Sequence, residues 1–286
     1  MATVGITSLE QLRGFAKQRP VWHADIVQKE LNGGKTTESD LAVLDSRPEV
    51  IALTVSGLDQ KSFEYLVRRH GDRLTALHLW KCPRIEDFTP LESMPLLTHV
   101  AIFWNQRALR LWNVCKTAAL QGLLFEDFVK LGDLDDLSNC TSLVELVFGN
   151  ANGSKMSVET LQPLSSLTSL RSLSLNPKEV RDGRIQPLAA LQQLQDVSFS
   201  SKLFTAEQIA WLRCKLPASL QSDALAPYRA IRQPLLVRGK SLDVLVNGYG
   251  KPFLSTKEDA ARLERFKSEF NLLLEKFRHD PALEPQ

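Results

Sequence analysis

Residues 74–82 read LTALHLWKC, and residues 97–105 read LTHVAIFWN. Both stretches fit the frame Leu-x-x-(Leu/Val)-x-(Leu/Ile)-x-x-(Cys/Asn), and they begin 23 residues apart. The alternation of apolar residues within each stretch predicts a short strand with one buried face. A strand that returns at a fixed interval predicts a repeat architecture, in which further copies follow at a similar spacing.

The same frame recurs through the middle of the chain. Seven copies begin at Val50, Leu74, Leu97, Leu120, Leu143, Leu170 and Leu194. Their intervals are 24, 23, 23, 23, 27 and 24 residues. Six positions before most frames stands an apolar residue, which follows a proline at Pro90, Pro163 and Pro187. Because the first turn of a helix tolerates proline, these segments predict short 3₁₀ or α-helical turns between the strands.

At this point the sequence resembles the leucine-rich repeat family, in its 22–24-residue internalin-like class, over residues 50–220. The resemblance implies an α/β solenoid, with a curved parallel sheet, short helical or 3₁₀ segments on the convex side, and caps at both ends. The family places Asn or Cys at the ninth frame position. Only Cys82 and Asn105 comply, whereas Phe128 and Ala151 do not. The polar ladder between coils is therefore expected to break after the third coil.

The chain divides into three regions by pattern. Residues 1–49 are expected to form a helical N-terminal cap, and residues 50–222 the leucine-rich repeat solenoid of about seven coils. Residues 223–286 read as a β-hairpin followed by a helix. They would act as a cap on the last coil, or as a small effector domain or a dimerisation helix.

Local signals refine the two ends. Amphipathic helices are expected in SLEQLRGFAKQ, VWHADIVQKEL and ESDLAVL of the N-terminal region. In the C-terminal region, Asn247–Gly248 predicts the two-residue hairpin turn, because this dipeptide adopts the required positive φ angles. Ser255 and Glu258 predict a capping box at the start of the last helix.

Composition limits the classes of function. The net charge is +2 and no concentrated basic face is present, so nucleic acid is not an expected partner. The sequence contains neither a long apolar run nor a secretory signal, which predicts a cytoplasmic location without a membrane partner. Four widely spaced cysteines argue against a disulfide framework or a zinc ribbon and predict reduced thiols.

Motifs for chemistry are incomplete. NGGKTT lacks the first glycine of a phosphate-binding loop, and GDLDDL lacks the ligands of a calcium loop. Five histidines form no ligand cluster, and no nucleophile elbow occurs. The sequence therefore predicts no catalytic residue, no cofactor and no metal, and it favours a protein that is not an enzyme.

Frame positions three, five and seven point out of the concave face, because side chains alternate along a strand. Equal positions on neighbouring strands lie about 4.8 Å apart, so aromatic residues on two coils come together. The predicted site consists of Trp80, Phe103 and Trp104, flanked by His78, His99 and Leu124, with Glu126, Asp127 and Glu145 as an acidic margin.

An exposed aromatic cluster with a charged margin is typical of a protein-binding hot spot. The sequence therefore predicts an adaptor or inhibitor that binds another protein through coils two to five. Three alternatives remain. The aromatic residues could simply stack on one another and stabilise the sheet. A terminal segment could cover these aromatic residues, or the activity could lie in residues 223–286, with the repeats as a targeting module.

Overall fold

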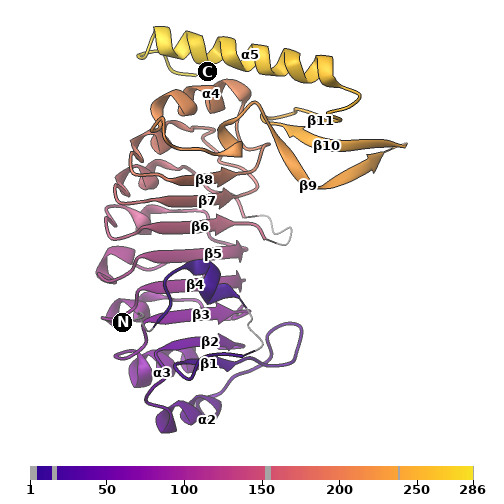
Figure 1. Cartoon of the computed structure of the whole chain (residues 1–286). Helices are drawn as coiled ribbons and strands as arrows, with labels where there is room; N and C mark the ends of the chain where they lie inside the picture. The colour runs from indigo at the N-terminus through magenta and orange to yellow at the C-terminus, as the bar shows by residue number, and fades with distance from the viewer. Residues whose placement is uncertain (1–4, 15–17, 152–155, 238, 286) are drawn as a thin grey trace.

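A parallel sheet runs the length of the molecule, and the repeated frames supply nearly all of its strands (Figure 1). The computed structural model describes residues 5–14, 18–151, 156–237 and 239–285. Each frame forms one coil of the solenoid, so strands that follow one another in sequence are neighbours in the sheet. This is the leucine-rich repeat solenoid that the spacing predicts.

Within the described residues the sheet has eight strands in sequential order. They are β1 (His23–Ile26), β2 (Ala52–Ser56), β3 (Ala76–Trp80), β4 (His99–Asn105), β5 (Gly122–Phe128), β6 (Glu145–Gly149), β7 (Ser172–Asn176) and β8 (Asp196–Phe199). Each strand from β2 onward begins at the third frame position, and equal frame positions pair across the sheet, as Ala52 does with Ala76. The predicted frame strands are confirmed.

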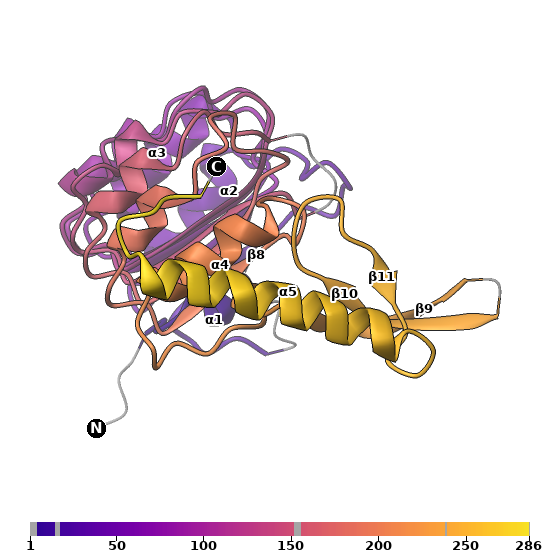
Figure 2. The same ribbon diagram turned by 90° about the horizontal axis from the view of Figure 1, so that it is seen from above.

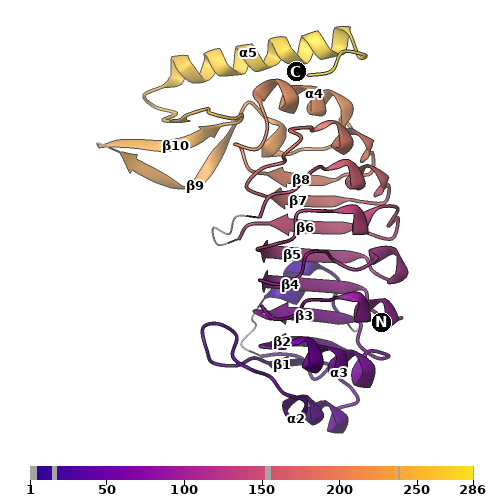
Figure 3. The same ribbon diagram turned by 180° about the vertical axis from the view of Figure 1, so that it is seen from behind.

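Short helical turns return the chain along the convex side (Figure 3). The 3₁₀ turns are η2 (Thr89–Ser93), η3 (Val114–Lys116), η4 (Asp135–Leu137), η5 (Gln162–Ser166) and η6 (Gln186–Ala190). Proline stands in the first turn of η2, η5 and η6, as the sequence predicts. Longer helices replace the 3₁₀ turn in two coils. They are α3 (Gln60–His70), with Asp59 as a capping-box N-cap, and α4 (Ala206–Lys215), with Thr205 in the same role.

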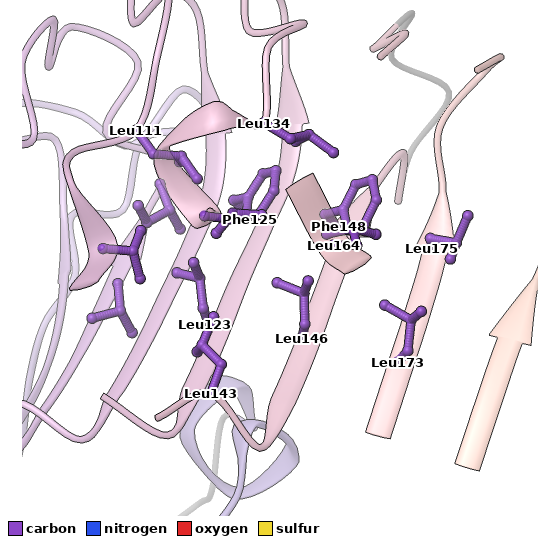
Figure 4. Packing of buried hydrophobic residues seen from close by; sticks show 14 of the residues in the cluster. Leu111, Leu123, Phe125, Leu134, Leu143, Leu146, Phe148, Leu164, Leu173 and Leu175 are labelled. Atoms are coloured by element: carbon purple, nitrogen blue, oxygen red, sulfur yellow. The ribbon is translucent and has the colours of Figure 1, made fainter. Parts of the chain in front are cut away.

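The core consists of apolar side chains stacked from coil to coil (Figure 4). At frame position four, Leu123, Leu146 and Leu173 follow one another on adjacent strands. At position six, the Phe125 and Phe148 rings stack with their centroids 5.3 Å apart. Each fully buried leucine or phenylalanine of this kind contributes about 1.5–3 kcal/mol through removal from water.

The polar ladder is present at Asn105 and ends there. The Asn105 amide nitrogen donates to the carbonyls of Cys82 and Ile85, at 3.2 and 2.9 Å. Its oxygen accepts from the backbone N–H groups of Arg107 and Ala108, at 3.0 and 2.8 Å. One coil later the fully buried Phe128 occupies the same frame position. An aromatic ring therefore fills the space that the amide fills in the preceding coil.

The N-terminal region contains a strand where the sequence indicates a helix. The helix expected in VWHADIVQKEL is wrong, because His23–Ile26 forms β1, which pairs in parallel with β2. The helix predicted in ESDLAVL is confirmed as α2 (Glu38–Leu41) and η1 (Ala42–Ser46). The helix predicted in SLEQLRGFAKQ is confirmed for α1 (Leu9–Arg13), and residues 15–17 lie outside the described part of the chain.

The C-terminal region forms a small antiparallel sheet that projects from the last coil (Figure 2). Its strands are β9 (Tyr228–Val237), β10 (Lys240–Val246) and β11 (Phe253–Leu254). The two-residue turn predicted at Asn247–Gly248 is wrong in its length: β10 and β11 pair antiparallel on either side of it, but their connection runs from residue 247 to 252. The Asn247 amide nitrogen donates to two backbone carbonyls at the end of the solenoid. One belongs to Asp223 in η7 (Asp223–Leu225), at 2.7 Å, and the other to Ala226, which follows η7, at 2.8 Å. Asn247 thus fastens the sheet to the solenoid end.

The last helix, α5 (Ala260–His279), lies across the end of the solenoid and packs on α4 (Figures 1 and 2). Its buried Phe270 and Phe277 join the solenoid core. The predicted Ser255–Glu258 capping box is wrong, because the helix starts later, with Asp259 as its N-cap. The Asp259 carboxylate accepts from the Ser255 N–H at 2.9 Å, which stabilises the turn before the helix.

Candidate functional site

Helix α1 lies on the concave face and not at the end of the solenoid (Figure 1). It contacts β3, β4 and β5, which supply the centre of the predicted site. Leu9 and Leu12, one helical turn apart, point into this face and are buried. Ile6, just before the helix, is buried beside them.

The concave face beneath α1 is lined by small side chains. Ala52, Ala76 and Ala101 are fully buried and form one apolar cluster with Leu9, Leu12 and Leu124. Gly122 completes this floor. A Cβ atom on Gly122 would lie 2.5 Å from the His99 ring and 3.2 Å from Leu9 Cγ. The missing side chain at Gly122 therefore leaves room for the His99 ring and lets Leu9 of α1 approach β5 closely.

Two carboxylates of the solenoid hold the ends of α1. Glu145 Oε2 accepts a hydrogen bond from the Leu9 N–H, which is unpaired within the helix, at 2.9 Å. At the other end, Arg13 forms an ion pair with Glu126 at 3.3 Å. Burial raises the pKa of the Glu126 carboxyl, and the Arg13 guanidinium opposes that rise. Through Arg13, helix α1 thus supplies a positive charge that favours the ionised form of the partly buried Glu126 carboxylate.

Two of the three aromatic residues of the predicted cluster, Trp80 and Phe103, come together. The Trp80 and Phe103 rings stack with their centroids 4.4 Å apart, and the Lys81 ammonium lies 5.3 Å from the centre of the Trp80 ring. The His78 ring packs edge-on against Trp80 at 5.7 Å. Trp104, next to the last residue of β4, adopts a positive φ of 62°, a left-handed conformation. Trp80 and Trp104 remain half-exposed at this edge of the sheet.

The predicted site residues separate into two groups by burial. Trp80, Trp104, Glu126 and Glu145 keep some contact with solvent. The buried members are Phe103, His78, His99, Leu124 and Asp127. They are not available to a partner while the N-terminal segment lies in place, so their assignment to an exposed contact surface is corrected. The alternative in which this segment covers part of the face applies to Leu124, which packs with Leu9 and Leu12, whereas Phe103 stacks on Trp80 and Asp127 accepts from the Ala151 N–H of the next coil.

The covered histidines show how strongly this surface is desolvated. Burial lowers the pKa of His78 from 6.5 to about 3, with the Arg19 and Arg13 guanidinium groups acting in the same direction. His99 is buried beside Gly122, and burial lowers its pKa as well. His23 on β1 has its pKa lowered to about 4, chiefly by burial. Neutral imidazoles thus belong to the covered face at pH 7.

Beyond α1 the concave face stays open. A groove of about 330 Å³ runs over β6, β7 and β8. It is lined by Glu126, Val147, Ser174, Asn176, Ser198 and Arg229, among others. Sequence reasoning places Val147, Ser174 and Ser198 on this face but misses Arg229, which lies outside the repeats at the start of β9. Arg229 donates to the Phe199 carbonyl at 3.0 Å, which fixes it at one end of the groove.

The groove carries opposite charges at its two ends. Burial lowers the pKa of the Arg229 guanidinium, and the group stays charged because an arginine side chain does not deprotonate in proteins. Glu126 lies at the other end, next to Arg13 of α1. Between them, Ser174 and Ser198 hydrogen-bond to each other at 2.9 Å. The arrangement offers a polar floor of small side chains between an acidic and a basic group.

The described parts of the chain hold no group of three or more His, Cys, Asp and Glu side chains placed to bind a metal ion. No helix in those parts is long and apolar enough to cross a membrane. All four cysteines lie within the described residues and are unpaired. Burial raises the pKa of the Cys82 thiol to about 12, so this group stays protonated in the core.

Comparison with known proteins supports no closer assignment than the fold. No protein-family model and no curated protein matches the sequence. An internalin, InlF, from Listeria monocytogenes has a similar structure at 22% identity and a TM-score of 0.38, covering 64% of this chain and 56% of its own. Internalin C2 from the same organism follows at 20% and 0.37, covering 58% of this chain and 77% of its own. The chain spans little more than half the length of the first.

Proposed function

We propose that this protein is a non-enzymatic interaction module, either an adaptor or an inhibitor, that binds another protein through its concave face. The open groove over β6–β8, with Glu126 and Arg229 at opposite ends, is the observation that carries this proposal. Frame position seven links the groove to Trp80, because Trp80, Phe103 and Glu126 lie side by side on β3, β4 and β5. This row places the half-exposed Trp80 and the groove on the same side of the sheet, with the buried Phe103 between them.

The chemistry of this surface favours a polypeptide over other ligands. Trp80 supplies a rigid, half-exposed anchor already stacked on Phe103, and tryptophan is enriched among binding hot spots. The serine floor offers hydroxyl groups that donate and accept hydrogen bonds with a peptide backbone. Glu126 and Glu145 would repel nucleic-acid phosphates. The surface therefore fits a protein partner with mixed polar and aromatic contacts.

We extend the proposal to a cytoplasmic location. The four unpaired thiols support it, since disulfides are rare in reducing compartments. Burial raises the pKa of the Cys140 thiol, as it does for Cys82, and keeps both groups unreactive. Subcellular fractionation of the native protein tests this point, and recovery with secreted proteins would contradict it.

The test fills the groove without touching the core. Ser174→Arg and Ser198→Arg together place two bulky cations on its floor. A matched control, Ser93→Arg with Ser165→Arg, puts the same charges on the convex turns η2 and η5. Proteins captured from a cell lysate by the wild-type chain are quantified by mass spectrometry for all three forms.

The proposal predicts that the captured amount of at least one protein is tenfold or more lower with the groove variant than with the wild type. The convex control should capture the same amount of that protein as the wild type does. Circular dichroism and urea unfolding establish that both variants are folded. Equal capture by the folded groove variant and the wild type would contradict binding at this groove. Loss of capture with the convex control alone would move the binding surface to the other side of the solenoid.

A further inference from the structure

We propose that the surface beneath α1 is itself a receptor for an amphipathic helix of a partner protein, and that α1 occupies it in the free chain. This inference rests on the proposed function and names a partner class for it. We call this surface the helix groove. It consists of Ala52, Ala76, Ala101, Gly122, Leu124, Glu126 and Glu145.

The shape of the helix groove matches a helix and not an extended strand. Its floor is made of alanines and Gly122, which leave room for two leucine side chains to insert. Leu9 and Leu12 are three residues apart, the spacing that places two side chains on one helical face. Helices that bind in grooves are recognised in this way, through apolar anchors at such spacings.

Charge defines the direction and the composition of the ligand. Glu145 accepts from an N–H of the first helical turn, and Glu126 pairs with a basic residue at the last position of α1. Both carboxylates belong to the solenoid, so they remain when α1 leaves. The ligand is therefore a helix with apolar residues at i and i+3 and a basic residue at i+4, bound with its N-terminus toward Glu145. An acidic helix would meet repulsion from Glu126.

The length of α1 makes exchange feasible. It has five residues, whereas isolated helices shorter than about 12–15 residues are only marginally stable in water. Leu9 and Leu12 are its buried apolar anchors, and Ile6 is buried just before it. A longer partner helix that begins at the residue equivalent to Leu9 and continues past the one equivalent to Arg13 can repeat these contacts and add others. Because α1 is tethered, it competes at an effective concentration on the order of mM, which weakens binding of the partner without blocking it.

The experiment releases α1 in the full chain and supplies a helix in trans. Leu9→Asp with Leu12→Asp replaces both anchors by charges. A matched control, Leu31→Asp with Leu96→Asp, makes the same changes at leucines that are 91% and 50% exposed. The probe is a fluorescent alanine-rich peptide of about 16 residues, long enough to form a helix, with Leu, Leu and Arg at i, i+3 and i+4 and the first Leu at the start of the helix, where its N–H is free to donate to Glu145. A second peptide carries Asp in place of both leucines.

Fluorescence anisotropy measures the affinity of each peptide for each protein. The released variant should bind the Leu-Leu-Arg peptide at least tenfold more tightly than the wild type and the control do, and should not bind the Asp peptide. Adding Glu126→Gln to the released variant should abolish its preference for Arg over Gln in the peptide. Equal affinity of the folded released variant and the wild type would overturn the proposal. So would an unchanged preference for Arg after Glu126→Gln.

A less disruptive variant serves if the aspartates disturb folding. Arg13→Glu keeps both leucines and replaces the ion pair with Glu126 by repulsion, so it should give a smaller gain in affinity in the same direction. No gain would count against the proposal. The groove variant Ser174→Arg/Ser198→Arg separates this inference from the proposed function. If the peptide fails to bind but that variant still loses its captured protein, the helix groove is wrong and the proposed function stands.

Discussion

Replacing Asn105 by alanine tests whether one side chain holds the loops of two coils together. The Asn105 amide bonds to the carbonyls of Cys82 and Ile85 and to the N–H groups of Arg107 and Ala108. Asn105 is 1% exposed, so water does not reach these groups in its place. A buried backbone group left without a partner costs about 1–3 kcal/mol.

The four losses are not simply additive. Arg107 is exposed, so the loop around it can relax and hydrate part of what alanine leaves unpaired. We therefore expect Asn105→Ala to lower the free energy of unfolding by about 3–5 kcal/mol, in the upper range for single substitutions. Asn113→Ala, at an exposed position before η3, is the control and should change it by less than about 0.5 kcal/mol.

Urea unfolding followed by far-ultraviolet circular dichroism measures both variants. The expected result is a lower midpoint for Asn105→Ala with an unchanged slope, because the surface exposed on unfolding stays the same. A loss below about 1 kcal/mol would refute the reasoning, since it would mean that the buried backbone groups of this loop do not depend on the side chain.

Two further predictions concern the core and the covered face. Phe128→Asn introduces the residue that the family places at the ninth frame position. It should lower the free energy of unfolding by about 3–5 kcal/mol in urea, because it removes a buried ring in contact with Phe125 and Phe88. A neutral effect would show that this position tolerates either residue. For His78, the pKa is about 3 in the folded state and 6.5 in the unfolded state, so only the unfolded state takes up a proton as the pH falls below about 6.5. The contribution of His78 to the free energy of unfolding is complete above pH 6.5 and falls by about 2 kcal/mol by pH 5. His78→Phe should therefore reduce the pH dependence of the urea midpoint between pH 7 and 5. An unchanged pH dependence would contradict the burial of this ring.

The sequence predicts the strands well where each strand repeats its neighbour. A side chain at a given frame position must pack on the same position one coil away, so the leucine spacing determines the register. Strand β1 lacks this signal, because Ala24 stands at its fourth frame position in place of Leu or Val, and Lys29 stands at its ninth. Pairing of β1 with β2 is a tertiary contact that the alternation in HADI alone does not distinguish from a helix.

The sequence predicts which side chains lie on the concave face but not which of them α1 covers. Frame positions correctly place Trp80, Phe103 and Glu126 on the concave side. They do not reveal that a five-residue helix lies over Ala76 and Ala101, because its docking depends on the small size of side chains from three different coils. A row of alanines and a glycine at outward positions was the available signal.

The most direct test of the central claim is a photo-crosslink from the concave face to a partner. A benzophenone amino acid replaces Ser198 in the groove or, as a control, Asp135 on the convex turn η4, and the full chain is illuminated in a cell lysate. Concave binding predicts a crosslinked protein of defined mass from position 198 and none from position 135. A crosslink from position 135 alone would contradict it.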